Sequence, residues 1–149
     1  MIYNLRPMSF DDIGFNITVE RALDKLRNSN NIRCNFKTSG DEYMVDSLVS
    51  LTLLRVIQEA CSNSIKHGHA KEINVSLKYE PKSLTLTIKD DGDGFDTSAI
   101  PEFTREDNSG FGLSMMKERI YLLSGKISIL SKPGEGCTVR VIIPVNKED

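Results

Sequence analysis

The chain has 149 residues and a formal net charge of −2, from 19 basic and 21 acidic side chains. This length fits one domain with a sizeable buried core. The near balance of charge argues against a nucleic acid or an anionic membrane surface as the main partner. No apolar stretch is long enough to cross a bilayer, and the N-terminus does not resemble a signal peptide. We therefore expect no partner nucleic acid and no direct membrane contact.

The chain has three cysteines, Cys34, Cys61 and Cys137, and their spacing forms no pairs. An odd number without paired spacing predicts buried or partly buried thiols in a reducing compartment. A disulfide framework is not expected, and the two histidines, His67 and His69, which lie together at a helix end, do not have the spacing of metal ligands.

Apolar residues at helical spacing predict three helices along the chain. The first covers 13–27, where Asp11 or Asp12 is placed to cap the N-terminus. The second covers 45–67. The third covers 114–123.

Gly125 is expected to cap the third helix at its C-terminus. Residues 97–109 have no clean period and contain a proline, so we expect a mobile loop there.

Alternating apolar and polar residues predict the strands. The predicted strands are 32–37, 73–80, 84–90, 126–131 and 137–145. Together these elements predict a two-layer α/β sandwich with about five strands and three helices.

The strand predicted at 84–90 ends in the sequence Asp-Asp-Gly-Asp-Gly. Because side chains alternate along a strand, Asp90 should face the core beside Ile88. A buried carboxylate needs hydrogen-bond donors, and Gly92 and Gly94 allow the backbone to approach a ligand closely. An acceptor at the bottom of such a pocket suits an amino-bearing planar base such as adenine. A plain turn is the alternative, because Asp-Gly steps are common in turns.

The second predicted helix carries a polar face near its C-terminal end. At about 100° per residue, Arg55, Glu59, Asn63, Lys66 and His67 fall on this one face. An amide, a carboxylate and a cation within two turns are the groups that hold Mg²⁺ and phosphate. An ordinary solvated helix face is the alternative.

A glycine-rich segment, Gly110-Phe111-Gly112-Leu113, precedes the third predicted helix. Free backbone N–H groups and the partial positive charge of a helix start favour an anion at such a place. A loop that simply needs flexible residues is the alternative.

In this order, the segments 59–67, 90–95 and 110–113 resemble the N, G1 and G2 boxes of the GHKL ATPase superfamily. Its members share an ATP-binding α/β sandwich, the Bergerat-type fold. The sequence is most similar to the catalytic ATP-binding domain of sensor histidine kinases. Within these it resembles the branch that works with response regulators carrying LuxR-type DNA-binding domains. The resemblance runs from about Leu5 to Pro144.

The resemblance implies an adenine site around the end of the strand at 84–90. Asp90 would accept a hydrogen bond from the adenine amino group, and Gly92 and Gly94 would line the base. Thr138 is a further candidate in this site. However, Cys137 stands where the family usually has threonine, and adjacent strand residues point to opposite faces.

The resemblance also implies a phosphate and metal site. Asn63 would coordinate Mg²⁺, and Lys66 and His67 would lie near the phosphates. Glu59 corresponds to a general base in water-splitting relatives, whereas in kinases it supports the metal and acceptor region. The triphosphate would be covered by Gly110, Gly112 and Leu113. The loop at 97–109 corresponds to the ATP lid.

The opening seven residues resemble the junction that follows the dimerisation domain of such kinases. We therefore expect residues 1–10 to be the remnant of a linker and 11–149 to be the catalytic ATP-binding domain. The implied partners are the upstream dimerisation and phosphoacceptor domain and a cognate response regulator. The full-length protein would be a homodimeric, membrane-bound sensor kinase with this domain in the cytoplasm. Alone, the chain should bind Mg²⁺ and ATP without phosphorylating itself, because neither His67 nor His69 has a phosphoacceptor context.

Two other functions are compatible with the sequence. An anti-sigma-factor serine kinase is a related protein that stands alone, but it would leave the opening residues unexplained. A nucleotide-binding docking module without catalysis is the other. It is favoured by Cys137 and by Phe111, which stands where many members of the branch have histidine.

Overall fold

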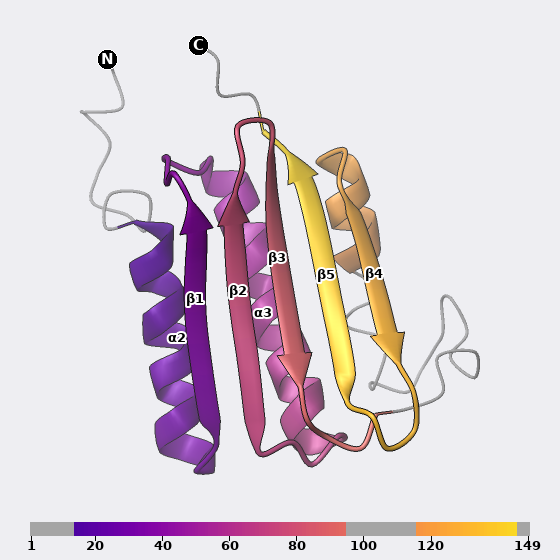
Figure 1. Cartoon of the computed structure of the whole chain (residues 1–149). Helices are drawn as coiled ribbons and strands as arrows, with labels where there is room; N and C mark the ends of the chain where they lie inside the picture. Colours follow the sequence, from indigo (N-terminus) through magenta and orange to yellow (C-terminus); the bar gives the residue numbers. More distant parts are fainter. Residues whose placement is uncertain (1–13, 95–115, 146–149) are drawn as a thin grey trace.

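A computed structural model of the chain describes residues 14–94 and 116–145. In these ranges a five-stranded sheet carries helices on one face, as Figure 1 shows. The prediction of a two-layer α/β sandwich with about five strands and three helices is confirmed.

The sheet is mixed, with the strand order β1-β2-β3-β5-β4. Its strands are β1 (Arg33–Gly40), β2 (Glu72–Tyr79), β3 (Ser83–Asp90), β4 (Lys126–Ser131) and β5 (Cys137–Pro144). β1 and β2 are parallel, and the other neighbouring pairs are antiparallel. This register pairs Asp90, the last residue of β3, with Cys137, the first residue of β5.

The two long helices are α2 (Phe15–Asn30) and α3 (Ser47–Lys66). Residues 116–122 are also helical. In Figure 1 these helices cover the same face of the sheet, and α3 runs behind its middle strands to the end where β3 finishes. Among the described helices, none has both the length and the apolar character that a membrane crossing requires.

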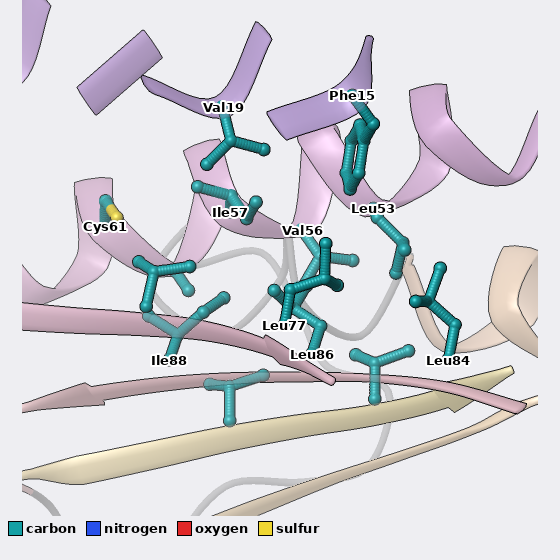
Figure 2. Close-up of a cluster of buried hydrophobic side chains, with 14 of the residues drawn as sticks. Phe15, Val19, Leu53, Val56, Ile57, Cys61, Leu77, Leu84, Leu86 and Ile88 are labelled. Atoms are coloured by element: carbon teal, nitrogen blue, oxygen red, sulfur yellow. The ribbon is translucent and has the colours of Figure 1, made fainter. Parts of the chain in front are cut away.

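One apolar core fills the space between the helices and the sheet. Leu53 and Ile57 of α3 have no exposed surface, and neither have Leu84 and Leu86 of β3. Figure 2 shows these side chains together with Val19 of α2 in a single cluster. Burial of these side chains removes apolar surface from water. Because apolar residues alternate along each strand, it also decides which face of the strand the helices cover.

The start of α2 differs from the prediction. The helix begins at Phe15, and Gly14 occupies the N-cap position with φ of 93° and no side-chain cap hydrogen bond. An N-cap residue must stand directly before the first helical residue. The prediction that Asp11 or Asp12 caps this helix is therefore wrong, and both aspartates lie outside the described residues.

The end of the third helix also differs. Ser124, not Gly125, adopts the left-handed conformation, with φ of 63°. The Gly125 N–H donates to the Ile120 carbonyl at 2.9 Å, and the Ser124 N–H donates to the Tyr121 carbonyl at 2.9 Å. These two bonds form a Schellman motif with Ser124 at the left-handed position. Close packing, not helix capping, explains why position 125 is a glycine, because a Cβ there would lie 2.7 Å from the Ile142 carbonyl oxygen.

Candidate nucleotide site at the end of β3

The buried carboxylate that the strand pattern predicts is present. Along β3 the residues Leu84, Leu86 and Ile88 are buried, and Asp90 continues the alternation, with only 8% of the residue exposed. The prediction that Asp90 faces the core at the end of its strand is confirmed. The carboxylate thus lies at the edge of the core, beneath the C-terminal part of α3.

Two groups donate hydrogen bonds to this carboxylate within the described ranges. The backbone N–H of Gly92 donates to Asp90 Oδ1 at 2.8 Å, and Ser64 Oγ lies 2.5 Å from Asp90 Oδ2. An ionised carboxylate offers about four acceptor sites. Two donors offset the cost of burial and leave acceptor capacity for a further group, so the site fits a ligand that presents an N–H.

Glycines bring three backbone segments together around Asp90. A Cβ on Gly92 would lie 2.4 Å from the Gly68 carbonyl oxygen, and one on Gly136 would lie 2.2 Å from the Asp90 carbonyl oxygen. Gly94 has φ of 67°, and a Cβ there would lie 2.7 Å from the Gly136 carbonyl oxygen. No other residue type fits these close approaches. The turn after α3, the loop after β3 and the turn before β5 therefore converge at this end of the sheet.

The loop after β3 is tied to the turn that follows α3. Asp91 Oδ1 accepts the N–H groups of Lys71 at 2.9 Å and Glu72 at 3.0 Å. The Asp93 N–H donates to the Gly68 carbonyl at 2.6 Å. Asp93 Oδ2 also lies 2.8 Å from His69 Nδ1. Asp91 and Asp93 thus hold the loop in place, which leaves Asp90 as the inward-facing carboxylate of the motif.

The predicted polar face lies near the C-terminus of α3, away from the core. Glu59 and Asn63 are half-buried, and Lys66 and His67 are exposed. The His67 N–H donates to the Asn63 carbonyl at 2.9 Å. Within the described ranges, these four side chains make no hydrogen bond or ion pair to another residue. They are therefore available to a ligand beside α3.

The described residues contain no group of three or more His, Cys, Asp or Glu side chains that could hold a metal ion. Asn63 offers one amide oxygen, half-buried and one residue before Ser64. Magnesium in nucleotide sites keeps several waters and is held by one or two protein oxygens together with phosphates. The donor set present therefore fits Mg²⁺ only as part of a metal–nucleotide complex.

The structure does not bring Thr138 to the carboxylate. Thr138 pairs with Lys89, whose side chain is exposed, whereas Cys137 pairs with Asp90. Because successive strand residues point to opposite faces, Thr138 lies on the face of β5 away from Asp90. Cys137 is the residue of β5 that lies directly opposite Asp90 on the same face.

Two thiols lie near Asp90. Burial, with a further contribution from the Asp90 charge, raises the pKa of Cys137 to about 11. Burial, with contributions from Cys34 and Asp90, raises the pKa of Cys61 to about 12. Both side chains are therefore neutral thiols near pH 7, and they add no negative charge beside the carboxylate.

Several predicted residues lie outside the described ranges. Gly110, Gly112 and Leu113 fall there, with Phe111 between the two glycines and the proposed lid at 97–109 before them. Sequence reasoning missed the contacts that Ser64 and Gly68 make in this site. Ser64 had a signal, since it is a polar residue on the apolar face of a predicted helix.

Residues 49–147 match the protein family described as Histidine kinase-, DNA gyrase B-, and HSP90-like ATPase. The chain belongs to this family. Among proteins similar to it, the signal transduction histidine-protein kinase/phosphatase DegS of Brevibacillus brevis is 34% identical over 149 residues, 100% of this chain and 37% of DegS. DegS of Bacillus subtilis (strain 168) is 35% identical over 144 residues, 95% of this chain and 37% of DegS. The chain thus spans 37% of the length of these two relatives.

Solved structures share the fold of this ATPase family member. The histidine kinase domain of the Erythrobacter litoralis EL346 blue-light activated histidine kinase aligns with a TM-score of 0.70 at 16% identity, over 89% of this chain and 62% of that one. The mycobacterial sensor histidine kinase MprB aligns with a TM-score of 0.62 at 20% identity, over 87% of this chain and 93% of that one. At these identities the likeness shows the fold alone, and it agrees with the family match, which makes the chain an ATP-binding domain of this ATPase family.

The anchoring of the loop by Asp91 gives a pH-dependent prediction. Hydrogen bonds from the Lys71 and Glu72 N–H groups hold the pKa of Asp91 below its ordinary value of 3.8. A group whose pKa is depressed by folding stabilises the folded state above its unfolded pKa, and this stabilisation is lost as the pH falls through the folded pKa. Asp91→Asn should therefore lower the free energy of unfolding above about pH 4, and the difference from wild type should shrink below it.

Urea denaturation of wild type and Asp91→Asn between pH 7 and pH 2.5 measures this difference. A gap that stays constant over the whole range would contradict the assigned role, because it would not depend on the ionisation of Asp91.

Proposed function

We propose that this chain binds ATP together with Mg²⁺ and delivers the γ-phosphate to a histidine on a separate dimerisation domain of the same kinase. The observation that carries the proposal is the buried Asp90 carboxylate, with acceptor capacity left over, at the end of β3 in a member of this ATPase family. The likeness to the DegS histidine kinases supports the choice of reaction.

Asp90 would accept a hydrogen bond from the exocyclic amino group of adenine. Gly92 and Gly94 would line the base, because their lack of a side chain leaves the backbone of the loop close to Asp90. Cys137 rather than Thr138 would contact the base, since it shares the face of Asp90. Its neutral thiol offers a small apolar surface to a planar ring.

The polar face of α3 would hold the phosphates and the metal. When bound, Mg²⁺ neutralises phosphate charge during transfer. Asn63 would supply the side-chain amide oxygen that coordinates the Mg²⁺ ion. Lys66 would place a positive charge near the phosphates. His67 would lie beside them, and Glu59 would support the metal and acceptor region. Gly110, Gly112 and Leu113 would cover the triphosphate from the other side.

The acceptor histidine would come from another domain. His69 lies against Asp93 in the turn after α3, and His67 follows directly on that helix. We assign neither as the phosphoacceptor. The partners would be the dimerisation and phosphoacceptor domain and a response regulator with a LuxR-type DNA-binding domain. The full-length protein would be a homodimer with this domain in the cytoplasm.

Asp90→Asn should weaken ATP binding about 10- to 100-fold, because hydrogen bonds to charged groups contribute roughly 1.5–3 kcal/mol. Isothermal titration with a non-hydrolysable ATP analogue measures the affinity. Asp41→Asn is the matched control, since it makes the same change at an exposed carboxylate away from this loop. Equal affinities for wild type and Asp90→Asn would show that the adenine site lies elsewhere.

Asn63→Asp should reduce the affinity for ATP in the presence of Mg²⁺ by about tenfold while leaving adenosine binding within about twofold, because the new carboxylate repels phosphate at short range. Titrations of ATP and adenosine, each with and without Mg²⁺, separate the two effects. Gln58→Glu is the control, with the same amide-to-carboxylate change at an exposed position of α3. A parallel loss of adenosine binding would assign Asn63 to the base instead.

Phosphate transfer should require the dimerisation domain. We expect no stable phosphohistidine when the chain alone is mixed with radiolabelled ATP and Mg²⁺, and labelling of the acceptor once the dimerisation helices are added. Acid and base stability of the label identifies the phosphoamino acid. Tight ATP binding without transfer in both mixtures would favour a non-catalytic docking module, and labelling of a serine on a partner protein would favour an anti-sigma-factor kinase.

A further inference from the structure

The hydroxyl of Ser64 lies between two acceptors in the core. Its residue is 6% exposed, and its Oγ lies 2.5 Å from Asp90 Oδ2 and 3.0 Å from the Ala60 carbonyl oxygen. A serine hydroxyl carries one proton, so it donates to one of these acceptors at a time. Which acceptor takes the proton decides what Ser64 does to the carboxylate.

The geometry favours Asp90 as the acceptor. Hydrogen bonds from a hydroxyl to an ionised oxygen are about 2.5–2.7 Å long and about twice as strong as neutral ones. The distance to Asp90 lies in this range, whereas 3.0 Å to the Ala60 carbonyl is at the long end for a hydroxyl donor. The Ser64 proton therefore goes to the carboxylate.

The two donors hold the two oxygens of Asp90 separately. Gly92 donates to Oδ1 from the loop, and Ser64 donates to Oδ2 from α3. A carboxylate held at both oxygens cannot turn about its Cβ–Cγ bond without losing a buried hydrogen bond. Its remaining lone pairs therefore point in set directions, and they can only accept.

We infer that Ser64 is a positioning residue that aligns Asp90 as a hydrogen-bond acceptor and so sets the preference of the site for a 6-amino purine. This inference rests on the proposed function, in which Asp90 contacts the adenine amino group. A 6-oxo purine presents an acceptor to the aligned carboxylate and is rejected. A purine with no group at position 6 gains nothing from the alignment.

The test compares three triphosphates on the intact chain. ATP, inosine triphosphate and purine riboside triphosphate share the sugar and the phosphates, and their bases carry at position 6 an amino group, an oxo group (with a proton on N1) and a hydrogen atom. For wild type we expect ATP to bind more tightly than the other two. In Ser64→Ala the ATP affinity should fall about 3- to 10-fold, while the affinity for purine riboside triphosphate should change less than about twofold. Titration calorimetry with Mg²⁺ present measures all three.

Two further variants separate positioning from folding. Ser64→Thr keeps the hydroxyl and should restore the preference for ATP. Ser50→Ala removes a buried serine hydroxyl from the same helix, where Oγ contacts the Val45 carbonyl at 3.4 Å. It should leave the ratio of the three affinities unchanged. Thermal unfolding of each variant reports whether the fold is intact.

The outcomes distinguish this inference from the proposed function. If wild type binds ATP but Ser64→Ala lowers the affinity for all three triphosphates equally, the role of Ser64 is structural. The inference then fails while the proposed function stands. If wild type does not prefer ATP over purine riboside triphosphate, the adenine contact of Asp90 fails, and the inference fails with it. A selective loss for ATP that Ser64→Thr restores supports the inference.

Discussion

The arrangement of this domain depends on one buried carboxylate and on the two hydrogen-bond donors that offset the free-energy cost of burying it. Asp90 is 8% exposed, and an ionised group at that depth is costly without partners. Gly92 supplies a backbone N–H from the following loop, and Ser64 supplies a hydroxyl from α3. These hydrogen bonds join the sheet, the loop and the helix at one point. They also place the acceptor next to the polar face of α3.

The loop that follows β3 is positioned by its own acidic residues and by close backbone contacts. Asp91 accepts two N–H groups from the start of β2 and the residue before it, and Asp93 bonds the turn after α3. Gly92 and Gly136 allow carbonyl oxygens of neighbouring segments to approach where a Cβ would collide. The three aspartates within residues 90–94 thus have different roles. Asp91 and Asp93 fix the loop to neighbouring segments, and Asp90 keeps acceptor capacity for a ligand.

Local periodicity was enough to predict much of this site. Alternation from Leu84 to Ile88 continued to Asp90, because a strand repeats every two residues whatever it packs against. The 3.6-residue period likewise placed Glu59 and Asn63 on a face away from the core. The same rule explains why Thr138 is separated from Asp90. The pairing of β5 with β3 puts Cys137 on the shared face, and the register of that pair comes from packing.

For the described part of the chain, the sequence alone determined the number and kind of elements, the fold class and the inward direction of Asp90, because these follow from local hydrophobic periods. Only the tertiary structure decided which group donates to that carboxylate. Ser64 lies 26 residues before Asp90, and their contact exists because α3 crosses β3 at this point. The tertiary structure also decided how the helices end. Gly14 is the N-cap of α2 and Ser124 is the left-handed residue that ends the third helix, and the sequence had pointed to other residues for both positions. Where a chain must fit its neighbours, the partners come from distant segments that no local pattern encodes.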